Sequence, residues 1–420
     1  MKTKLFLIGL FCAFANELKA QLTLDAEIRP RYEYRNGFIK LAEKDQDPAS
    51  FIYQRSRFNV NYKNENIHLY LSFQDYRTWG SEEQLNKSDD NLSIHQAWVD
   101  MKLNDNLRAK LGRQEINLDD QRIFGAVGWT QQGRSQDALI LKYKKDNFKF
   151  DLGLAYNQDD DVLSGNTYIG EKNYKTFQYG WFHHDWDNMS ASLLFLNNGM
   201  QYIDIDPDEV ETRYSQTIGT HIKGKSGEIN WFANVYIQTG EHVSGADINA
   251  YLIGGEAMYA RADADYKFGL GAELISGNDQ DDPNNEVNAF SPFYGTNHKF
   301  NGWMDYFYVA GNHKNNVGLM DIYAKGVYKF NKKSNVLLMA HQFSSAGKIV
   351  KGDKAETMSF GTEIDMAFTH KLNSDVTFKV GYSHMFVEEG LEIIKNNFDD
   401  ETNNWGWVML VIKPTLFTSK

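Results

Sequence analysis

Apolar and charged residues alternate strictly near the start of the chain. In residues 22–35, "LTLDAEIRPRYEYR", the even positions are apolar or aromatic, and the odd positions from 25 onward are all charged. A helix turns about 100° per residue and would scatter these charges around its surface, whereas a strand places them all on one side. The pattern predicts a β-strand with one polar and one apolar face.

The same two-residue period recurs along the whole chain. It is found in "RFNVNY" (57–62), "FKFDLGLAY" (148–156), "INWFANVYI" (229–237), "YKFGLGAEL" (266–274), "MSFGTEIDMAF" (358–368) and "VTFKVGY" (376–382). A one-residue slip in residues 22–35 would turn six charges to the apolar side, and near the middle of a membrane each arginine there would cost about 2–4 kcal/mol. We therefore expect an all-β fold with a fixed register.

The connections between the predicted strands fall into two classes. Eight are short, near residues 64–66, 104–106, 145–147, 185–188, 224–227, 261–265, 331–335 and 372–375. Nine are long, near residues 36–50, 78–92, 115–136, 158–174, 198–211, 240–248, 277–315, 346–355 and 388–403. The two classes alternate, beginning and ending with a long one, so together they join eighteen strands.

This alternation predicts an 18-stranded antiparallel transmembrane β-barrel with short periplasmic turns and long extracellular loops. Residues 300–311, "FNGWMDYFYVAG", resemble one more strand. Counting them would put every later short turn at the wrong end, so we assign them to the seventh long loop, folded inward. A soluble sandwich or propeller also has alternating strands, but its long and short connections need not alternate.

Composition agrees with a barrel that has a wet interior. The mean hydropathy of −0.55, with 14% aromatic residues and 33 glycines, excludes a bundle of apolar helices but suits strands that show lipid only every second residue. We find no linker that would divide the chain, so residues 21–420 are expected to form one domain in the outer membrane of a Gram-negative bacterium.

The first twenty residues read as a secretory signal peptide. "MKTK" precedes the apolar run 5–15 and the ending "LKA", which predicts cleavage after Ala20. The apolar run is shorter than the roughly twenty residues that a spanning helix needs. The single cysteine, Cys12, lies in this leader, so disulfides, thiolate metal sites and cysteine nucleophiles are excluded from the mature chain.

The mature chain is strongly acidic. Removing residues 1–20, which contain three lysines and one glutamate, changes the formal net charge from −12 to −14. This balance argues against nucleic acid as a partner.

Arginines are concentrated in the first third of the chain. Ten of the twelve lie at or before residue 134. The predicted register turns a basic set into the lumen: Arg29, Arg31, Arg35, Arg55, Arg57, Arg108 and Lys110. Guanidinium groups suit capture of carboxylate or phosphate, so these residues could form a ladder of anion sites. They could equally pair with Asp25, Glu27, Glu33 and Asp100 and brace the wall.

Two segments resemble the alginate export family of outer-membrane porins. In "GRQEINLDDQRIFGAVGWTQQGRSQDALIL" (112–141), the matching residues are Gly112, Arg113, Gln114, Asp120, Arg122, Trp129, Arg134 and Asp137. "FYGTNHKFNGWMDYF" (293–307) also resembles a family segment. The resemblance implies a monomeric barrel of eighteen strands with an arginine-rich, loop-constricted pore for an acidic polysaccharide. It adds Arg113, Arg122 and Arg134 to the expected pore residues.

Two features depart from that pattern. The predicted lumen also contains carboxylates, which weakens an anion-only channel: Glu256, Glu273, Asp321, Glu363 and Asp365. Strict alternation from Leu111 would turn Arg113 toward lipid, and a bulge at Gly112 would bring it back to the pore.

Other chemistry is weakly supported. The acidic runs at 157–161, 204–209, 278–286 and 398–404 lack the spacing of a calcium loop and are interpreted as solvated loops. No helical histidine pair suggests zinc, so we expect no metal and no cofactor. Ser383 and His384 are the only adjacent Ser–His pair, and neighbours on a strand face opposite sides, so we do not expect an enzyme.

The sequence therefore predicts a channel that is embedded in outer-membrane lipid. An anionic poly- or oligosaccharide, or small anions, would pass through this channel by diffusion. A general porin remains an alternative. So does a structural or ligand-binding barrel plugged by the loops at 115–136 and 277–315.

Overall fold

The computed structural model describes residues 20–85, 91–168, 173–203, 210–284, 286–309, 313 and 316–419. The expected signal peptide, except Ala20, lies outside these residues and stays a prediction. The acidic run 204–209 also lies outside them.

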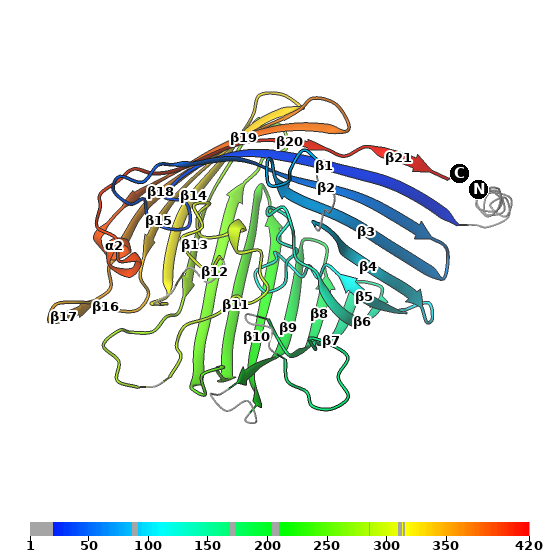
Figure 1. Ribbon diagram of the computed structural model, residues 1–420, viewed down its shortest axis with the longest axis horizontal. Coiled ribbons are helices and arrows are strands. Elements are labelled where there is room, and N and C mark those ends of the chain that lie inside the picture. Colours follow the sequence, from blue (N-terminus) through cyan, green and yellow to red (C-terminus); the bar gives the residue numbers. More distant parts are fainter. Residues whose placement is uncertain are drawn as a thin grey trace.

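Eighteen antiparallel strands form one closed barrel (Figure 1). They are β1 (Gln21–Asn36), β2 (Ala49–Lys63), β3 (Ile67–Thr78), β4 (Leu92–Lys102), β5 (Leu107–Gln114), β6 (Gln136–Lys145), β7 (Phe148–Tyr156), β8 (Thr176–Asp185), β9 (Met189–Ile203), β10 (Val210–Ser226), β11 (Ile229–Glu241), β12 (Asp247–Tyr259), β13 (Tyr266–Ile275), β14 (Leu319–Lys329), β15 (Ser334–Ser344), β18 (Ser359–Lys371), β19 (Val376–Val387) and β20 (Asn403–Ile412).

The first and last strands close the ring. β1 pairs with β2 on one side and with β20 on the other, and β21 (Thr415–Thr418) prolongs β20 along β1. Lys413 and Pro414 separate β20 from β21, because proline has no N–H to donate to a ladder. The predicted barrel of eighteen strands is confirmed.

The two faces of each strand differ as the alternation predicts. In β1, Arg31 is 3% exposed and Glu33 is fully buried, whereas Ile28 and Tyr32 are 44% and 42% exposed. Buried charge inside and exposed apolar surface outside are the reverse of a water-soluble protein and match a barrel with a lipid-facing wall.

Short turns and long loops alternate around the barrel as predicted. The short turns span 64–66, 103–106, 146–147, 186–188, 227–228, 260–265, 330–333 and 372–375. Four of them contain an asparagine whose side-chain oxygen accepts backbone N–H groups two and three residues later: Asn64, Asn104, Asn331 and Asn373. Such side-chain bonds explain why these short turns form where they do.

The long loops carry the remaining elements. The hairpin of β16 (Ile349–Lys351) and β17 (Lys354–Glu356) lies between β15 and β18, and α2 (Glu389–Lys395) lies between β19 and β20 (Figure 1). A single 3₁₀ turn, η1 (Asn297–Lys299), lies between β13 and β14. Among the described residues, no helix combines the length and apolar character that crossing a bilayer requires.

Two long loops fold into the barrel and build a core there. We name them loop 3 (residues 115–135) and loop 7 (residues 276–318). Phe124 of loop 3 packs on Phe177, Tyr179 and Tyr294, with ring centroids 5.1–5.5 Å apart, and it forms a parallel bridge with Tyr294 of loop 7. The predicted inward course of residues 300–311 is confirmed for the described part, because Met304 and Tyr306 are fully buried.

Candidate functional site

Arginines on the first two strands hold the end of loop 3. The Arg29 guanidinium donates to the carbonyl oxygens of Gly128 and Thr130, both at 2.7 Å, and to the Gln131 side chain at 3.0 Å. Arg31 donates to the Trp129 carbonyl at 2.8 Å, and its guanidinium lies 4.3 Å from the centre of the Trp129 ring. These guanidinium groups supply hydrogen bonds to backbone carbonyl groups that are buried inside the barrel.

The same arginines are also paired with buried carboxylates. Arg55 lies 2.6 Å from Glu27, and Glu33 lies 2.7 Å from Arg31 and 2.8 Å from Arg35. Arg29, Arg31 and Arg55 are 3–6% exposed. The geometry of these three positions fits the bracing role, since each side chain is enclosed and lies against a carboxylate or a loop 3 carbonyl.

Three other predicted basic residues stay nearer to open lumen. Arg57 donates to Gln74 at 2.7 Å and to the Gln132 carbonyl at 3.3 Å. Arg108 pairs with Asp100 at 2.8 Å, yet 34% of its side chain is exposed. The Lys110 ammonium lies 4.0 Å from the centre of the Trp98 ring. These contacts are fewer than those of Arg29, so these cations are more available to a solute.

Arg113 lies at the barrel rim, and the predicted bulge at Gly112 is wrong. Gly112 pairs in unbroken register with Trp98 and Ala138 on its two neighbouring strands. Gly112 itself takes a φ of +120°, a conformation that glycine adopts without the clash of a Cβ, so the strand needs no extra residue there. Arg113 therefore shares the outward face with Leu111 and pairs with Asp137 at 2.9 Å at the barrel rim.

The irregularity lies one strand away. The pairing between β3 and β4 shifts between Ser72 and Phe73, which leaves His95 as the extra residue of β4. His95 turns inward and is 5% exposed.

The two loop 3 arginines connect it to loop 7. Arg122 is fully buried and donates to Glu273 at 2.6 Å and to Asn301 at 3.1 Å. Arg134 donates to the Gly295 carbonyl at 2.8 Å, and burial lowers the pKa of its guanidinium. Both residues are close to the predicted pore, where they join the two loops.

Carboxylates of the later strands β13 and β18 hold loop 7. Glu363 on β18 accepts the backbone N–H groups of Trp303 at 2.5 Å and Met304 at 2.8 Å through one oxygen. Glu273 accepts the Asn301 amide at 2.9 Å. Arginines thus hold the carbonyls of loop 3, and carboxylates hold the N–H groups of loop 7. Sequence reasoning placed these carboxylates in the lumen but not their role as anchors, since nothing in the sequence pairs them with a loop.

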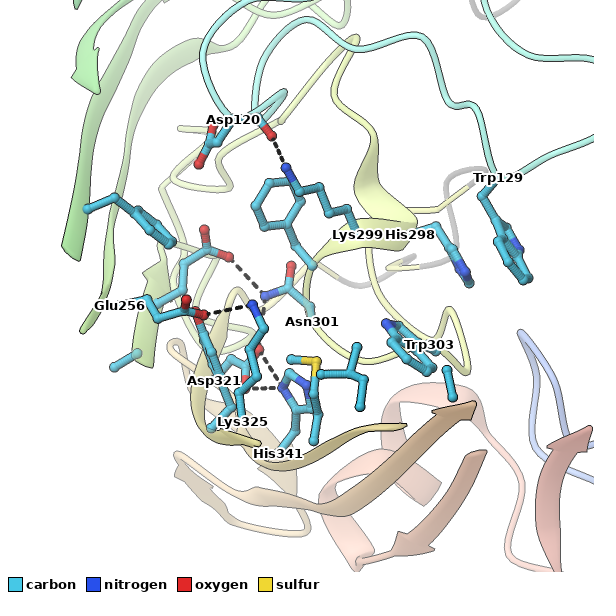
Figure 2. A pocket seen from close by; sticks show the side chains of 18 of the residues that line it. Asp120, Trp129, Glu256, His298, Lys299, Asn301, Trp303, Asp321, Lys325 and His341 are labelled. Carbon is cyan, nitrogen blue, oxygen red and sulfur yellow. Dashed lines mark hydrogen bonds and ion pairs between the residues drawn. The ribbon is translucent and has the colours of Figure 1, made fainter. Parts of the chain in front are cut away.

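Between the loops and the short-turn end lies a cavity of about 430 Å³, which we name the inner chamber (Figure 2). Its aromatic lining is Trp129, Phe232, Phe300, Trp303, Tyr323, Trp405 and Trp407. Its charged lining is Asp120, Glu256, Glu273, Asp321, Lys299, Lys325 and Lys379. Burial lowers the pKa of Lys299, whose ammonium donates to the Asp120 carbonyl at 2.7 Å.

Sequence reasoning did not predict this chamber. The alternation of "WGW" at 405–407 was a usable signal, because it turns both tryptophans to the same face. Glu256 and Lys325 lie 3.2 Å apart on one side, and Trp129 and Trp303 lie on the other (Figure 2).

A second cavity, of about 550 Å³, lies at the long-loop end, and we name it the outer pocket. Its lining includes eight uncharged polar residues and the carboxylates of Asp137 and Glu241; the uncharged ones are Ser135, Gln136, Asn157, Asn173, Ser215, Gln238, Ser291 and Asn316. Arg134 and Arg113 border it as well. This lining suits a hydrated polar solute at the entrance.

Serine and histidine side chains come close together at His95. His95 lies 3.1 Å from the Ser135 hydroxyl and 2.8 Å from Glu115. However, Ser135 also donates to the His95 backbone carbonyl, so its hydrogen is committed away from the imidazole. Ser383 points inward to Asp365, and His384 lies on the outer face against Phe386, as the alternation predicts.

Within the described ranges, no three His, Cys, Asp or Glu side chains come together as a metal site would require.

Comparison with known proteins supports the barrel and its family. The model of the family described as "Alginate export" matches residues 20–396. No curated protein matches the chain.

Solved outer-membrane proteins have the same fold. The outer membrane protein OpdK of Pseudomonas aeruginosa is 9% identical, with a TM-score of 0.64 over 94% of this chain and 98% of that one. OccAB1 of Acinetobacter baumannii is 10% identical, with a TM-score of 0.62 over 94% of this chain and 97% of OccAB1. A BenF-like porin of Pseudomonas fluorescens Pf-5 is 12% identical, with a TM-score of 0.61 over 94% of this chain and 99% of that porin.

Proposed function

The chain belongs to the alginate export family, and from this premise we propose that it is an outer-membrane channel for anionic saccharides or small carboxylates. Passage is by diffusion, and the barrel acts as a monomer. The closed barrel, the family and the similar solved structures support a channel; the anionic solute, the passive mechanism and the monomeric state belong to the proposal.

The observation that carries the proposal is a row of incompletely enclosed cations on the wall beside loop 3. Side-chain exposure is 34% for Arg108 and 41% for Lys142, and each has a single carboxylate partner. A channel needs sites that attract a solute and still release it, which favours such half-occupied cations over fully satisfied ones. Arg57 and Lys110 extend this row, and Arg134 adds a cation at the outer pocket.

Carboxylate is the preferred anionic group. Guanidinium groups bind it through paired hydrogen bonds, and the lumen already contains two such contacts, in which Arg31 and Arg35 each place two nitrogens on the Glu33 carboxylate. OpdK has also been solved with vanillate, an aromatic carboxylate, and we extend that chemical class to this chain.

A second candidate function is a barrel that binds a ligand without net transport. Loops 3 and 7 meet through Phe124 and Tyr294 and build an apolar core across the lumen. A lumen crossed in this way could block conduction, so conductance discriminates between the two functions.

The anion preference is tested by reversal potentials in planar bilayers under a KCl gradient. The variant Arg57→Ala, Arg108→Ala, Lys110→Ala removes three lumen cations, and we expect its anion-over-cation permeability to fall several-fold. A control, Arg261→Ala, Lys332→Ala, Lys333→Ala, removes the same charge from exposed short turns and should leave the potential unchanged. Equal potentials for the wild type and the lumen variant would refute the assignment of these cations.

A further inference from the structure

Most arginines lie on one side of the lumen, and a group of inward carboxylates lies on the other. Most arginines lie on β1, β2, β5 and loop 3, whereas the inward carboxylates Glu256, Glu273 and Asp321 lie on β12, β13 and β14. The chain runs once around a ring of eighteen strands, so β4 and β13 are nine strands apart and face each other across the lumen. The arginine side also carries Glu27, Glu33 and Asp100, so the lumen contains both signs of charge, and the carboxylates of β12, β13 and β14 lie apart from most of the arginines.

The carboxylate side of the inner chamber keeps free acceptors. One Glu256 oxygen receives Lys325 and Tyr323, both at 3.2 Å, and one Glu273 oxygen receives Arg122 at 2.6 Å. Within the described part of the chain, the second oxygen of each carboxylate meets no hydrogen-bond donor.

The β19–β20 side of the chamber, four to five strands from β13 around the ring, keeps free donors. The Lys379 ammonium lines the chamber and has no hydrogen-bond or ion-pair partner among the described residues. Trp407 also lines it and is 4% exposed, and its indole Nε1 is buried without an acceptor among those residues. A buried unpaired N–H is costly, which makes it a signal for an absent acceptor.

A glycine fixes the position of that indole. A Cβ at Gly381 would come within 2.3 Å of the Trp407 ring, so only glycine lets the ring lie flat on β19. Lys379 precedes Gly381 by two residues and therefore shares its face. The ammonium and the indole N–H thus adjoin on one wall of the chamber.

A solute that satisfies both walls needs an acceptor at one end and a cationic donor at the other. Its body should be flat and apolar, because Phe300, Trp303 and Tyr323 line the space between. The volume of about 430 Å³ falls within the range of small-molecule sites.

We propose that the inner chamber binds a small zwitterion, its carboxylate on Lys379 and Trp407 and its ammonium on Glu256 and Glu273. This inference rests on the proposed channel function and narrows the solute at this chamber to molecules that carry both charges. A simple anion has no ammonium to pair with Glu256 and Glu273, and a simple cation has no carboxylate to pair with Lys379. Each singly charged solute therefore lacks one of the two charge pairs that a zwitterion forms.

The test uses three probes that share a phenyl body: L-phenylalanine, 3-phenylpropanoate and 2-phenylethylamine. Binding to the purified, folded full-length barrel in detergent at pH 7 is measured by calorimetry. We expect phenylalanine to bind on the order of tenfold more tightly than either singly charged probe, the effect of one additional charge-assisted hydrogen bond.

Variants assign each end of the probe. Lys379→Met and Trp407→Phe should each weaken phenylalanine and 3-phenylpropanoate several-fold and leave 2-phenylethylamine unchanged. Glu256→Gln should weaken the two ammonium-bearing probes instead. Lys223→Met removes an exposed lysine of β10 outside the chamber and should change none of the three affinities.

Heat-dependent gel migration verifies that each variant barrel is folded. The inference is overturned if 3-phenylpropanoate binds as tightly as phenylalanine, or if no probe binds, or if the chamber variants behave as Lys223→Met does. Conductance in KCl is measured on the same protein. Conduction without a zwitterion preference would refute this inference alone, and absence of conduction would refute the proposed function.

Discussion

At the scale of single residues, the arginines show how burial decides between two roles for one side chain. Arg29 makes hydrogen bonds with Gly128, Thr130 and Gln131 in an enclosed site, whereas Arg108 makes one ion pair and stays one-third exposed. The first is a clamp on loop 3 and the second is a candidate solute site. Periodicity predicts that both face inward, but it contains no information on which loop covers which arginine.

A substitution at Arg29 tests the clamp. Arg29→Ala should destabilise the barrel by several kcal/mol, because each buried carbonyl left without a donor costs about 1–3 kcal/mol. Loop 3 should also become cleavable by an added protease. Urea unfolding and limited proteolysis measure these effects, and Arg35→Ala, whose side chain is about one-third exposed, is the control. A resistant loop 3 in Arg29→Ala would contradict the clamp.

Arg113 marks the limit of motif reasoning at this scale. Its side-chain direction follows the strand alternation and not the family pattern, and the bulge sits at His95 on the neighbouring strand. The position of a bulge depends on the pairing partner, which a single sequence does not specify.

At the scale of elements, the two inward loops set the shape of the lumen. The strict alternation of short and long connections excluded residues 300–311 as a wall strand, and this was enough to predict that loop 7 folds inward. The contact between Phe124 and Tyr294 was not predictable, because 170 residues separate the two and each side chain fits any apolar neighbour. The inner chamber was not predictable for the same reason, since residues of loop 3, loop 7 and the wall strands line it together.

Glu363 provides a test of the loop 7 anchor. Glu363→Ala removes the acceptor for Trp303 and Met304, so loop 7 should fluctuate and single-channel current should become noisier with larger conductance levels. Glu363→Gln keeps an oxygen at that place and should resemble the wild type. Identical current traces for the alanine variant and the wild type would show that these bonds do not control loop 7.

Helix α2 contributes a pH-dependent effect. Burial lowers the pKa of Lys395 to about 8, and its ammonium donates to the Tyr306 carbonyl at 2.6 Å. Below about pH 8 the lysine is charged in both states, and its burial lowers the free energy of unfolding. As pH rises from about 8 toward the ordinary lysine pKa, the folded state loses this proton before the unfolded state does, so the destabilisation disappears. Unfolding free energy should increase over that window relative to Lys395→Met, as urea titrations at pH 7 and 10 would show. An equal pH dependence in both proteins would contradict this effect.

At the scale of the whole molecule, the two-residue period determines most of the architecture. Strand count, closure, the alternation of connections and the inverted polarity of the wall all follow from it. Only the arrangement inside the barrel required three-dimensional information: which charges are consumed by the loops, and which remain for a solute. The fold was thus more predictable than the site.

Adjacent residues of β15 test the inverted polarity. Leu338 is 48% exposed on the outer wall, and Met339 lines the inner chamber. Leu338→Arg should destabilise the barrel in lipid by about 2–4 kcal/mol, whereas Met339→Arg should cost clearly less because its charge enters the lumen. Urea unfolding in vesicles compares the two. A larger loss for Met339→Arg would mean that the assigned faces are wrong.

The most direct measurement of the central claim is the conductance of the purified wild-type barrel in a planar bilayer. We expect discrete current steps in KCl and, under a salt gradient, a reversal potential that indicates higher permeability for anions than for cations. A folded, inserted barrel that produced no current steps would contradict the channel and would leave loops 3 and 7 as a permanent plug.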